Sequence, residues 1–564
     1  MEHLICITLA APMLAALLVL FSPNAKAARA IAAVGSAIAL IASLLIFKKF
    51  DPNFGGFQFQ NDIAWLPQLG FSLHVGLDGI SLAMLLLTTF VGFCAILASD
   101  DIEARGKTYY SLMLVMIATT SAAFVSLNLF FFYFFAEIAT LPKYLLVGMW
   151  GRNPGGGSGR SKAYAAIQQT IFIGGGALVA LVSLIALYFL GGRTLDLVAL
   201  SQNIAKAGIA EDWQRWIFGG LLFGFGAWVS IVPLHAWSPA AYSASPTGAA
   251  MFFAGVSKKL GAYAIIRIGL ALLPAGAHAW AAPLAVLAAI SILYAGFVAM
   301  RQQDWQPLIG YSSVSHAGYM FLGIAALTPT AVNGVVLFMV AHGLMTALLF
   351  ATAGSVARQT GTREIRGGGG LARVLPFTAV LTAMGVLASA GVPGFANFVS
   401  ELMIFIGTWQ AGTFVMKLAT IAAVWGLVIT ATYLLRALRD TFYGPLPARS
   451  EAMKETIGPA TKFATIALVI ALLILGFQPR LLTDGIKASL GNFQSLEKTA
   501  AKISNDWKAA APEARKSQIS NPKSQTNSKS EIRNKELLSS SSLGKVVSIS
   551  PQFRISSDEA EGRF

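Results

Sequence analysis

The sequence predicts an all-α polytopic membrane protein, and three observations support this prediction. Of its 564 residues, 55% are hydrophobic and only 12% are charged, whereas a soluble chain carries about 25% charged residues. The mean hydropathy is +0.65. Stretches apolar enough to cross a hydrocarbon core, which takes about 20 residues per helix, recur from Leu4 to about Gly476. A soluble globular enzyme is therefore not expected.

Helix length and chain breaks divide these stretches into about fourteen transmembrane helices. The first is interpreted as a retained helix, because Glu2 and His3 stand where a signal peptide has basic residues. The predicted spans are residues 3–22, 29–47, 76–98, 110–127, 129–149, 163–191, 215–233, 246–272, 280–300, 308–326, 331–356, 376–410, 414–440 and 457–478.

Two of the predicted regions contain residues that interrupt a helix. The seventh and eighth spans are joined through Pro233, Pro239 and Pro246, and the twelfth is interrupted at Gly391-Val-Pro-Gly394. Backbone groups freed at such breaks must find partners inside the protein. Broken helices in paired positions are typical of inverted-repeat transporters, although a packing kink is the simpler alternative.

Loop charges predict the orientation, because positive residues remain on the cytoplasmic side. Lys and Arg are more frequent in the loops that lie inside when the N-terminus is outside, and an even number of spans puts the C-terminus outside as well. The net charge of +15 is explained by these loops and by the tail, so a nucleic-acid partner is not expected. Residues 481–511 are predicted to form an amphipathic surface segment, and residues 512–564 are polar and are predicted to be a disordered tail.

Ionisable residues inside the spans are the candidate functional residues, since a charge in hydrocarbon costs roughly 2.5–3.5 kcal/mol. Glu137 has no counter-charge at helical spacing, because Lys143 is six residues further on and points to another face. Lys258 and Lys259 diverge by about 100° and cannot share one role. The remaining candidates are His316, His342 and Glu401.

Glu137, Lys259, His316, His342 and Glu401 together form a sparse series of titratable groups, as proton transfer across the bundle requires. Each has a simpler interpretation: a hydrogen-bonded neutral carboxyl, a lysine whose amine reaches the membrane surface, or a histidine bonded within the core. The sequence contains no recognisable phosphate loop, catalytic triad or zinc motif. Two cysteines in apolar segments lack the spacing of a metal or iron–sulfur site.

Residues 4–478 resemble the antiporter-like subunit M of proton-translocating NADH–quinone oxidoreductase, respiratory complex I, called chain 4 in mitochondria. The resemblance depends on several motifs that occur in order. They are Gly76-Leu-Asp78-Gly-Ile-Ser81-Leu, Phe135-Ala-Glu137 with Pro142 and Trp150-Gly151, Val232-Pro-Leu-His235-Ala-Trp237-Ser-Pro239, Ala244-Ser-Pro246-Thr247, Lys259-Leu-Gly261-Ala-Tyr263, Leu308-Ile-Gly-Tyr311-Ser-Ser-Val-Ser-His316, Ala341-His342-Gly343 and Gly391-Val-Pro393-Gly-Phe-Ala-Asn397-Phe-Val-Ser-Glu401.

The resemblance implies a fourteen-helix fold with two inverted five-helix repeats, each containing a broken helix. The implied organisation is residues 1–110 for helices 1–3, 111–272 for the first repeat, 273–440 for the second and 441–480 for the last helix. By the same resemblance, the five residues have roles in proton translocation. Glu137 is the acid of a Glu–Lys pair, Lys259 the central lysine, His316 and His342 the linking histidines, and Glu401 the terminal carboxylate.

The resemblance also implies a setting. The chain would be a subunit of a translocase, with no redox chemistry of its own and no cofactor or metal site. NADH, FMN, iron–sulfur clusters and quinone would belong to partner subunits. The partners would be the L- and N-type antiporter-like chains and the lipid of a bacterial inner membrane.

This sequence departs from the family at one important position. Trp228 stands where the family has the lysine that pairs with Glu137, and Lys143 occupies a usually apolar position. Two alternatives therefore remain open beside a proton-translocating complex I subunit. One is the D-type chain of a multisubunit Na⁺/H⁺ antiporter or the membrane arm of a hydrogenase, and the other is a structural subunit that no longer pumps.

Overall fold

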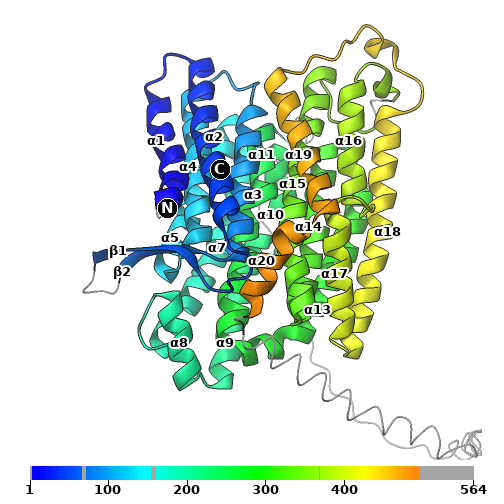
Figure 1. Cartoon of the computed structure of the whole chain (residues 1–564). Coiled ribbons are helices and arrows are strands. Elements are labelled where there is room, and N and C mark those ends of the chain that lie inside the picture. The colour runs from blue at the N-terminus through cyan, green and yellow to red at the C-terminus, as the bar shows by residue number, and fades with distance from the viewer. Residues whose placement is uncertain (1–2, 67–70, 154–160, 367–368, 492, 494–564) are drawn as a thin grey trace, which may run out of the picture. The chain divides into compact units, whose positions relative to one another are not determined.

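The computed structural model describes residues 3–66, 71–153, 161–366, 369–491 and 493. Within this part of the chain, long helices run roughly parallel as one bundle (Figure 1). The helix α15 (Pro329–Thr360) and the helical segment 247–270 are buried along their whole apolar length, so they form the centre. Other helices, such as α1 (His3–Leu20) and α18 (Phe414–Phe442), expose apolar side chains, as expected of surfaces that face lipid or partner subunits.

The remaining elements follow the chain in a regular order. They are α2 (Ala25–Lys49), β1 (Gln58–Leu66), β2 (Phe71–Leu77), α3 (Gly79–Leu97), α4 (Gly106–Val125), α5 (Leu129–Ile138), α6 (Thr140–Trp150), α7 (Lys162–Leu190), α8 (Leu197–Ala207), α9 (Glu211–Val229), α10 (Trp237–Ala244), α11 (Thr247–Phe252), η2 (Phe253–Ser257), α12 (Lys259–Ala264), η3 (Ile265–Leu270), α13 (Pro274–Met300), α14 (Trp305–Ala325), η4 (Leu371–Arg373), α16 (Pro376–Ser389), α17 (Ala396–Gln410), η5 (Ala448–Ser450), α19 (Pro459–Phe477) and α20 (Arg480–Gly491).

All of the fourteen predicted spans coincide with a helix or with consecutive helices, which confirms the predicted fold class. In the described residues, 11 helices are long and apolar enough to cross a membrane. The other predicted spans correspond to α9, α14 and the α16–α17 pair, which are shorter or less apolar. The exact number of spans and the boundaries of the repeats remain predictions.

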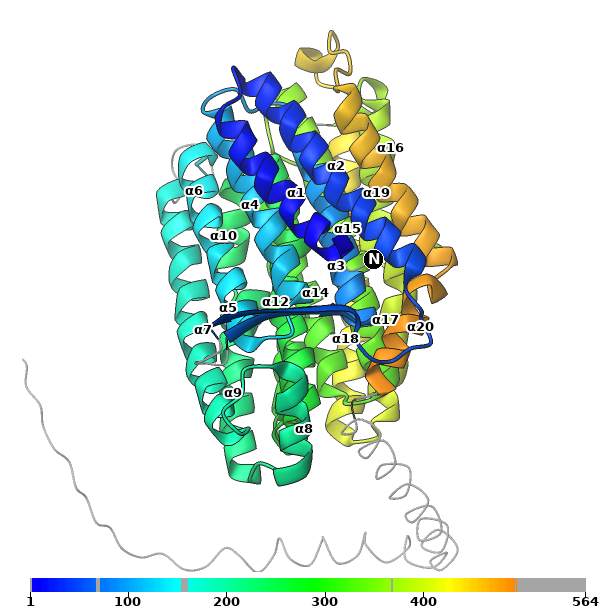
Figure 2. The same cartoon turned by 60° about the vertical axis from the view of Figure 1, so that its left-hand side comes forward.

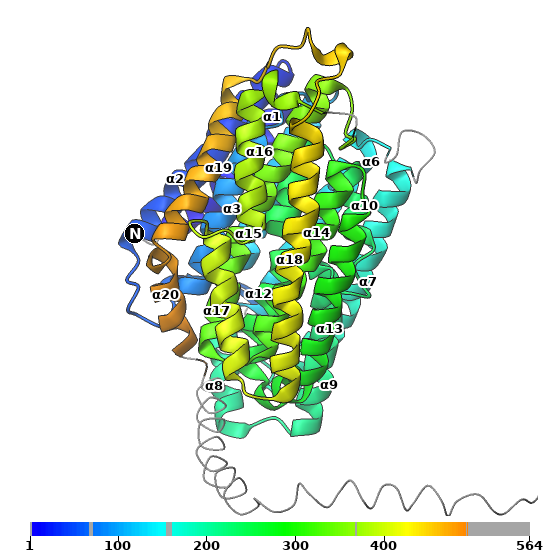
Figure 3. The ribbon, with the colours of Figure 1, turned by 90° about the vertical axis from the view of Figure 1, so that its right-hand side faces the viewer.

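Both predicted helix breaks are present. The α9 helix ends at Val229, Ser230 has a positive φ of 65°, the Val232–Pro233 bond is cis, and α10 starts only at Trp237. In the second region, α16 ends at Ser389 and α17 starts at Ala396. Figure 3 shows these two half-helices in line beside the unbroken α18. At each break, a short stretch of non-helical backbone therefore separates two helices.

The β-hairpin and α8 were not predicted, because neither is a long apolar stretch that would indicate a transmembrane span. The two strands pair antiparallel, with Asp62 opposite His74 and Asn61 opposite Val75. Figure 2 shows the hairpin lying across the bundle, over the α4–α5 side. The His74 ring nitrogen Nδ1 lies 2.5 Å from Asp196 Oδ2, and Asp196 also caps α8 by accepting a hydrogen bond from the amide of Ala199. This pair attaches the hairpin to the loop before α8.

The pH dependence of the His74–Asp196 pair can be predicted. The hydrogen bond to Asp196 raises the pKa of His74 above 6.5. Burial favours the neutral acid of Asp196, but hydrogen bonds from His74 and Ala199 outweigh this and lower its pKa below 3.8. The pair therefore stabilises the fold at pH values between the lowered pKa of Asp196 and the raised pKa of His74. Its contribution is lost as the pH rises through the raised pKa of His74.

We expect His74→Gln to remove that alkaline loss of stability. The thermal midpoint of the wild type should fall more than that of His74→Gln between pH 6 and pH 8. The difference should be small, on the order of 1 °C, because the pair is partly exposed. Equal falls in both proteins, measured by thermal scans in detergent, would show that the pair does not titrate in this range.

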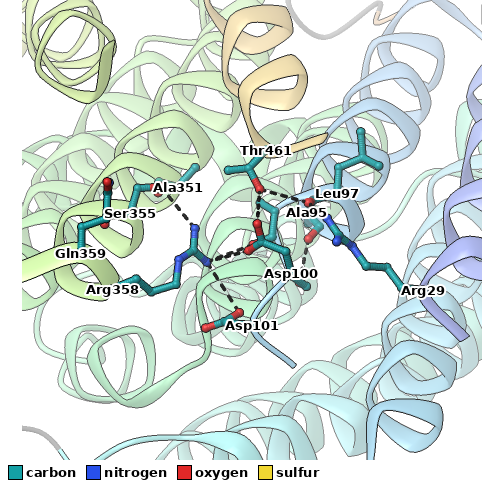
Figure 4. A network of polar contacts seen from close by, with 12 residues as sticks. Arg29, Ala95, Leu97, Asp100, Asp101, Ala351, Ser355, Arg358, Gln359 and Thr461 are labelled. Carbon is teal, nitrogen blue, oxygen red and sulfur yellow. Dashed lines mark hydrogen bonds and ion pairs between the residues drawn. The ribbon is translucent and has the colours of Figure 1, made fainter. Parts of the chain in front are cut away.

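A second polar network joins helix ends that are distant in the sequence (Figure 4). The Arg358 guanidinium at the end of α15 lies 3.1 Å from Asp100 Oδ1 and 3.6 Å from Asp101 Oδ1. Asp100 also accepts a hydrogen bond of 3.0 Å from Thr461 of α19. Arg29 of α2 donates to the carbonyl of Leu97. This network holds together the ends of α2, α3, α15 and α19.

The segment predicted as an amphipathic surface helix begins as α20, but its apolar face is not free. Ile486 and Leu490 are buried, and α20 packs against α3 and α15. Ser489 accepts a hydrogen bond of 2.8 Å from the amide of Gly79, the first residue of α3. Residues 480–491 therefore form an amphipathic helix whose apolar face is covered by protein, while the opposite face is exposed. Residues 492, 494–511 and the predicted tail 512–564 lie outside the described residues.

Candidate functional site

Lys258 and Lys259 lie at the centre of the bundle, where α12 follows the π-helical turn η2. Both side chains are buried, with exposed fractions of 2% and 0%. The Lys258 Nζ atom donates to the carbonyl and the hydroxyl of Ser313, both at 2.9 Å. The Lys259 Nζ atom donates to the carbonyl of Ala254 at 2.5 Å and lies 2.9 Å from His342 Nδ1. The two lysines point to different helices, as the sequence predicted.

Close packing of two backbones brings Lys259 to His342. A Cβ atom at Gly343 would lie 2.5 Å from the carbonyl oxygen of Gly255, so only glycine permits this approach of α15 to η2. The imidazole of His342 is fully buried and also contacts the Thr346 hydroxyl. Packing, and not a loop, therefore holds the Lys259–His342 contact in place.

His316 continues the line from His342 across to α14. The centroids of the two rings are 5.4 Å apart. His316 Nδ1 lies 2.7 Å from the carbonyl oxygen of Ser312, and Nε2 lies 3.3 Å from the carbonyl oxygen of Ser389. Ser389 is the last residue of α16, so the line reaches the second helix break. Three of the predicted residues, Lys259, His342 and His316, are thus brought together.

Glu401 lies across that break, in α17, and is 1% exposed. Neither of its carboxylate oxygens has a hydrogen-bond partner, and both polar side-chain atoms of Asn397 also lack one. A Cβ atom at Gly391 would lie 2.4 Å from Glu401 Oε2, so the break itself borders the carboxylate. Glu401 is close to the end of the histidine line but makes no direct contact with it.

Glu137 is separated from the other four residues. It lies in α5, its Oε1 atom is buried, and that atom has no hydrogen-bond partner. Trp228 stands in the position of the family lysine and carries no charge that could pair with Glu137. Its ring nitrogen donates a hydrogen bond of 3.0 Å to the carbonyl oxygen of Ile173. No ion pair within 4.0 Å joins Glu137 to a basic side chain in the described part of the chain.

Sequence reasoning missed a buried ion pair beside this line. Arg267 of η3 donates to Asp78 Oδ1 at 2.5 Å and to the Ser81 hydroxyl at 3.1 Å, and the two charged side chains are 6% and 3% exposed. Ser81 in turn contacts Tyr263, whose hydroxyl donates to the carbonyl of Phe124. The sequence could have indicated this pair, because Arg267 is a charged residue within a predicted span and Asp78 belongs to one of the motifs. Because both charges are paired with each other, we interpret the Asp78–Arg267 ion pair as structural.

The arrangement can bind and release protons in the bundle interior. Amines, imidazoles and carboxyls are the side chains that exchange protons, and here they occur in series on different helices. Helix breaks next to such groups are typical of transporters in which irregular backbone lines the path of an ion. The geometry therefore defines a membrane transport subunit that carries protons or small cations.

Comparison with known proteins gives the family. The profile described as NADH:quinone oxidoreductase/Mrp antiporter, TM, matches residues 126–426. The chain is 32% identical over 490 residues to NAD(P)H-quinone oxidoreductase chain 4 of Synechococcus sp. (strain WH7803), an alignment that covers 85% of this chain and 87% of that protein. It is 36% identical over 403 residues to a chain 4 of Picosynechococcus sp. (strain ATCC 27264 / PCC 7002 / PR-6), covering 70% and 71%.

Solved structures agree with this result. A chain of respiratory complex I from Thermus thermophilus matches with a TM-score of 0.79 and 26% identity, over 87% of this chain and 99% of that one. A chain of the Mrp complex from Dietzia sp. DQ12-45-1b shares the fold, with a TM-score of 0.74 and 21% identity, over 88% and 99%.

The chain therefore belongs to the family of antiporter-like membrane subunits shared by NADH:quinone oxidoreductase and Mrp antiporters. Within this family it is of the complex I type, chain 4 or subunit M, which confirms the resemblance seen in the sequence. It is a multi-pass membrane protein of a multisubunit respiratory complex. The roles of the five individual residues remain predictions.

Proposed function

We propose that this chain translocates protons in the membrane arm of an NADH–quinone oxidoreductase. The observation that carries the proposal is the buried contact series Lys259–His342–His316, which ends at the helix break beside Glu401. Protons would enter the series near Glu137 and leave near Glu401. The relatives named as chain 4 of this enzyme support the same function.

The remaining parts of the reaction belong to other subunits in this proposal. NADH, FMN, iron–sulfur clusters and quinone would bind partner chains, and this chain would contribute no redox step of its own. Its partners would be the L- and N-type antiporter-like chains. The membrane would be a bacterial inner membrane.

The proposed orientation places the N-terminus outside. Lys26 and Arg29 follow the α1–α2 turn, and Lys454 lies in the α18–α19 loop, at the same end of the bundle (Figure 1). The α8–α9 connection lies at the opposite end and contains few basic residues. The positive-inside rule assigns the first end to the cytoplasm.

The test is proton pumping in vesicles that contain the assembled complex, measured with a pH-sensitive dye after addition of NADH. Lys259→Ala should lower the protons moved per NADH by about tenfold or more, because it removes the group that contacts His342. The amount of assembled complex, checked on native gels, must match the wild type. Unchanged pumping in an assembled Lys259→Ala complex would instead support a structural subunit.

A further inference from the structure

The Glu137 carboxyl has no basic side chain within 4.0 Å among the described residues, and the line of lysines and histidines does not reach it. Its buried Oε1 atom has no hydrogen bond. Lys143 lies six residues further along the same apolar segment, near enough for the charges of the two side chains to act on each other. On an unbroken helix, residues six apart would point in different directions. Here α5 ends at Ile138 and α6 starts at Thr140, with Ala139 between them still helical in φ and ψ. Pro142 has no amide to bond the carbonyl of Ile138, so the chain between the two side chains is not a regular helix.

Lys143 is buried but has no fixed partner. Its exposed fraction is 6%, and no hydrogen bond or ion pair joins it to another described residue. A buried ammonium without such a bond is costly unless water or a nearby carboxylate compensates its charge. Lys143 borders a cavity of about 10 Å³, close to the space that one water molecule needs.

The walls of this cavity carry polar atoms that also lack protein partners. Gln169 is 1% exposed and neither its amide nitrogen nor its amide oxygen is bonded, and the hydroxyl of Ser257 has no partner either. On the same wall as Ser257 lies Lys258, which donates to Ser313 of α14. The cavity therefore connects Lys143 of α6 with Lys258 at the centre of the bundle.

The indole of Trp228 lines the same cavity. A lysine at position 228 would thus place its amine beside the cavity that Lys143 borders. The two positions lie on different helices, α9 and α6, and they are alternative places from which a lysine reaches one cavity.

We propose that Lys143 is the proton-carrying partner of Glu137 in this chain, and that the cavity beside Gln169 and Ser257 links it to Lys258. The proposal rests on the proposed function. In the transfer, the Lys143 ammonium releases a proton into the cavity toward Lys258 and becomes a neutral amine. That amine then accepts a proton from the Glu137 carboxyl, which is left as a carboxylate.

The experiment compares three variants of the whole complex in vesicles, with protons moved per NADH as the measurement. Lys143→Met should lower this ratio by about tenfold or more, as expected for loss of a proton-transfer group. Lys143→Met combined with Trp228→Lys should recover most of it, because the new amine reaches the same cavity. Lys417→Met is the matched control, since Lys417 lies over the ring of Trp409 and away from the cavity, and it should pump normally.

Two outcomes would overturn the proposal. One is wild-type pumping by Lys143→Met, and the other is a loss that Trp228→Lys does not restore, which would indicate a packing role. If Lys143→Met does not assemble, Lys143→Gln replaces it in the same comparison. Lys259→Ala, measured in parallel, separates the two proposals: if it stops pumping while Lys143→Met does not, the proposed function stands and only the role of Lys143 fails.

Discussion

Arg267→Met should destabilise the folded chain by about 3–5 kcal/mol, because it leaves Asp78 as a buried charge without a counter-ion. Asp78 is also the N-cap of α3, where it accepts a hydrogen bond of 2.9 Å from the amide of Ser81. Loss of the ion pair therefore affects the start of a central helix. The expected result is little or no assembled complex, measured on native gels and by the thermal midpoint of what remains.

The double variant Asp78→Asn with Arg267→Met is the informative control. Asparagine is as good an N-cap as aspartate but carries no charge, so the double variant should be more stable than Arg267→Met alone. If Arg267→Met assembled as well as the wild type, the pair would contribute nothing to folding. If the double variant were the less stable of the two, the unpaired charge would not be the cause.

Most of the fold could be predicted because the membrane imposes it. A helix must satisfy its own backbone groups in hydrocarbon, so long apolar stretches such as residues 331–356 leave few alternatives. The breaks at Pro233 and Gly391 were predicted because proline and glycine interrupt a helix. The hairpin was not, because residues 58–77 are polar enough to lie outside the apolar stretches. The buried face of α20 was missed because amphipathicity does not tell whether protein or lipid covers the apolar side.

The residues of the candidate site could be predicted from the sequence, but the contacts between them could not. Lys259, His316 and His342 are rare ionisable residues in apolar spans, which identified them, and their contact depends on a close approach at Gly255 and Gly343 that spacing does not show. The relation of Lys143 to Glu137 could not be derived from spacing alone, because the two side chains belong to consecutive helices that meet at Ala139.

The second helix break leads to another strong prediction. Gly391 has a φ of 67° and Gly394 a φ of 102°, so alanine is strained at both positions. The surroundings differ: a Cβ atom at Gly391 would meet Glu401 Oε2 at 2.4 Å, whereas the nearest atom to a Cβ at Gly394 is in Phe477, at 3.7 Å. Gly391→Ala should therefore displace the carboxylate, and Gly394→Ala should not.

Because a displacement of about 1 Å can cost up to 10²-fold in a step that depends on position, we expect Gly391→Ala to lower protons moved per NADH by about tenfold. Gly394→Ala has at least as much backbone strain, because a φ of 102° lies further from the left-handed region that alanine can adopt. It should nevertheless pump close to the wild-type ratio once the amount of assembled complex is matched. Equal losses in the two variants would mean that strain in the break, and not the place of Glu401, limits translocation. A selective loss in Gly391→Ala would show that the break serves to position this carboxylate.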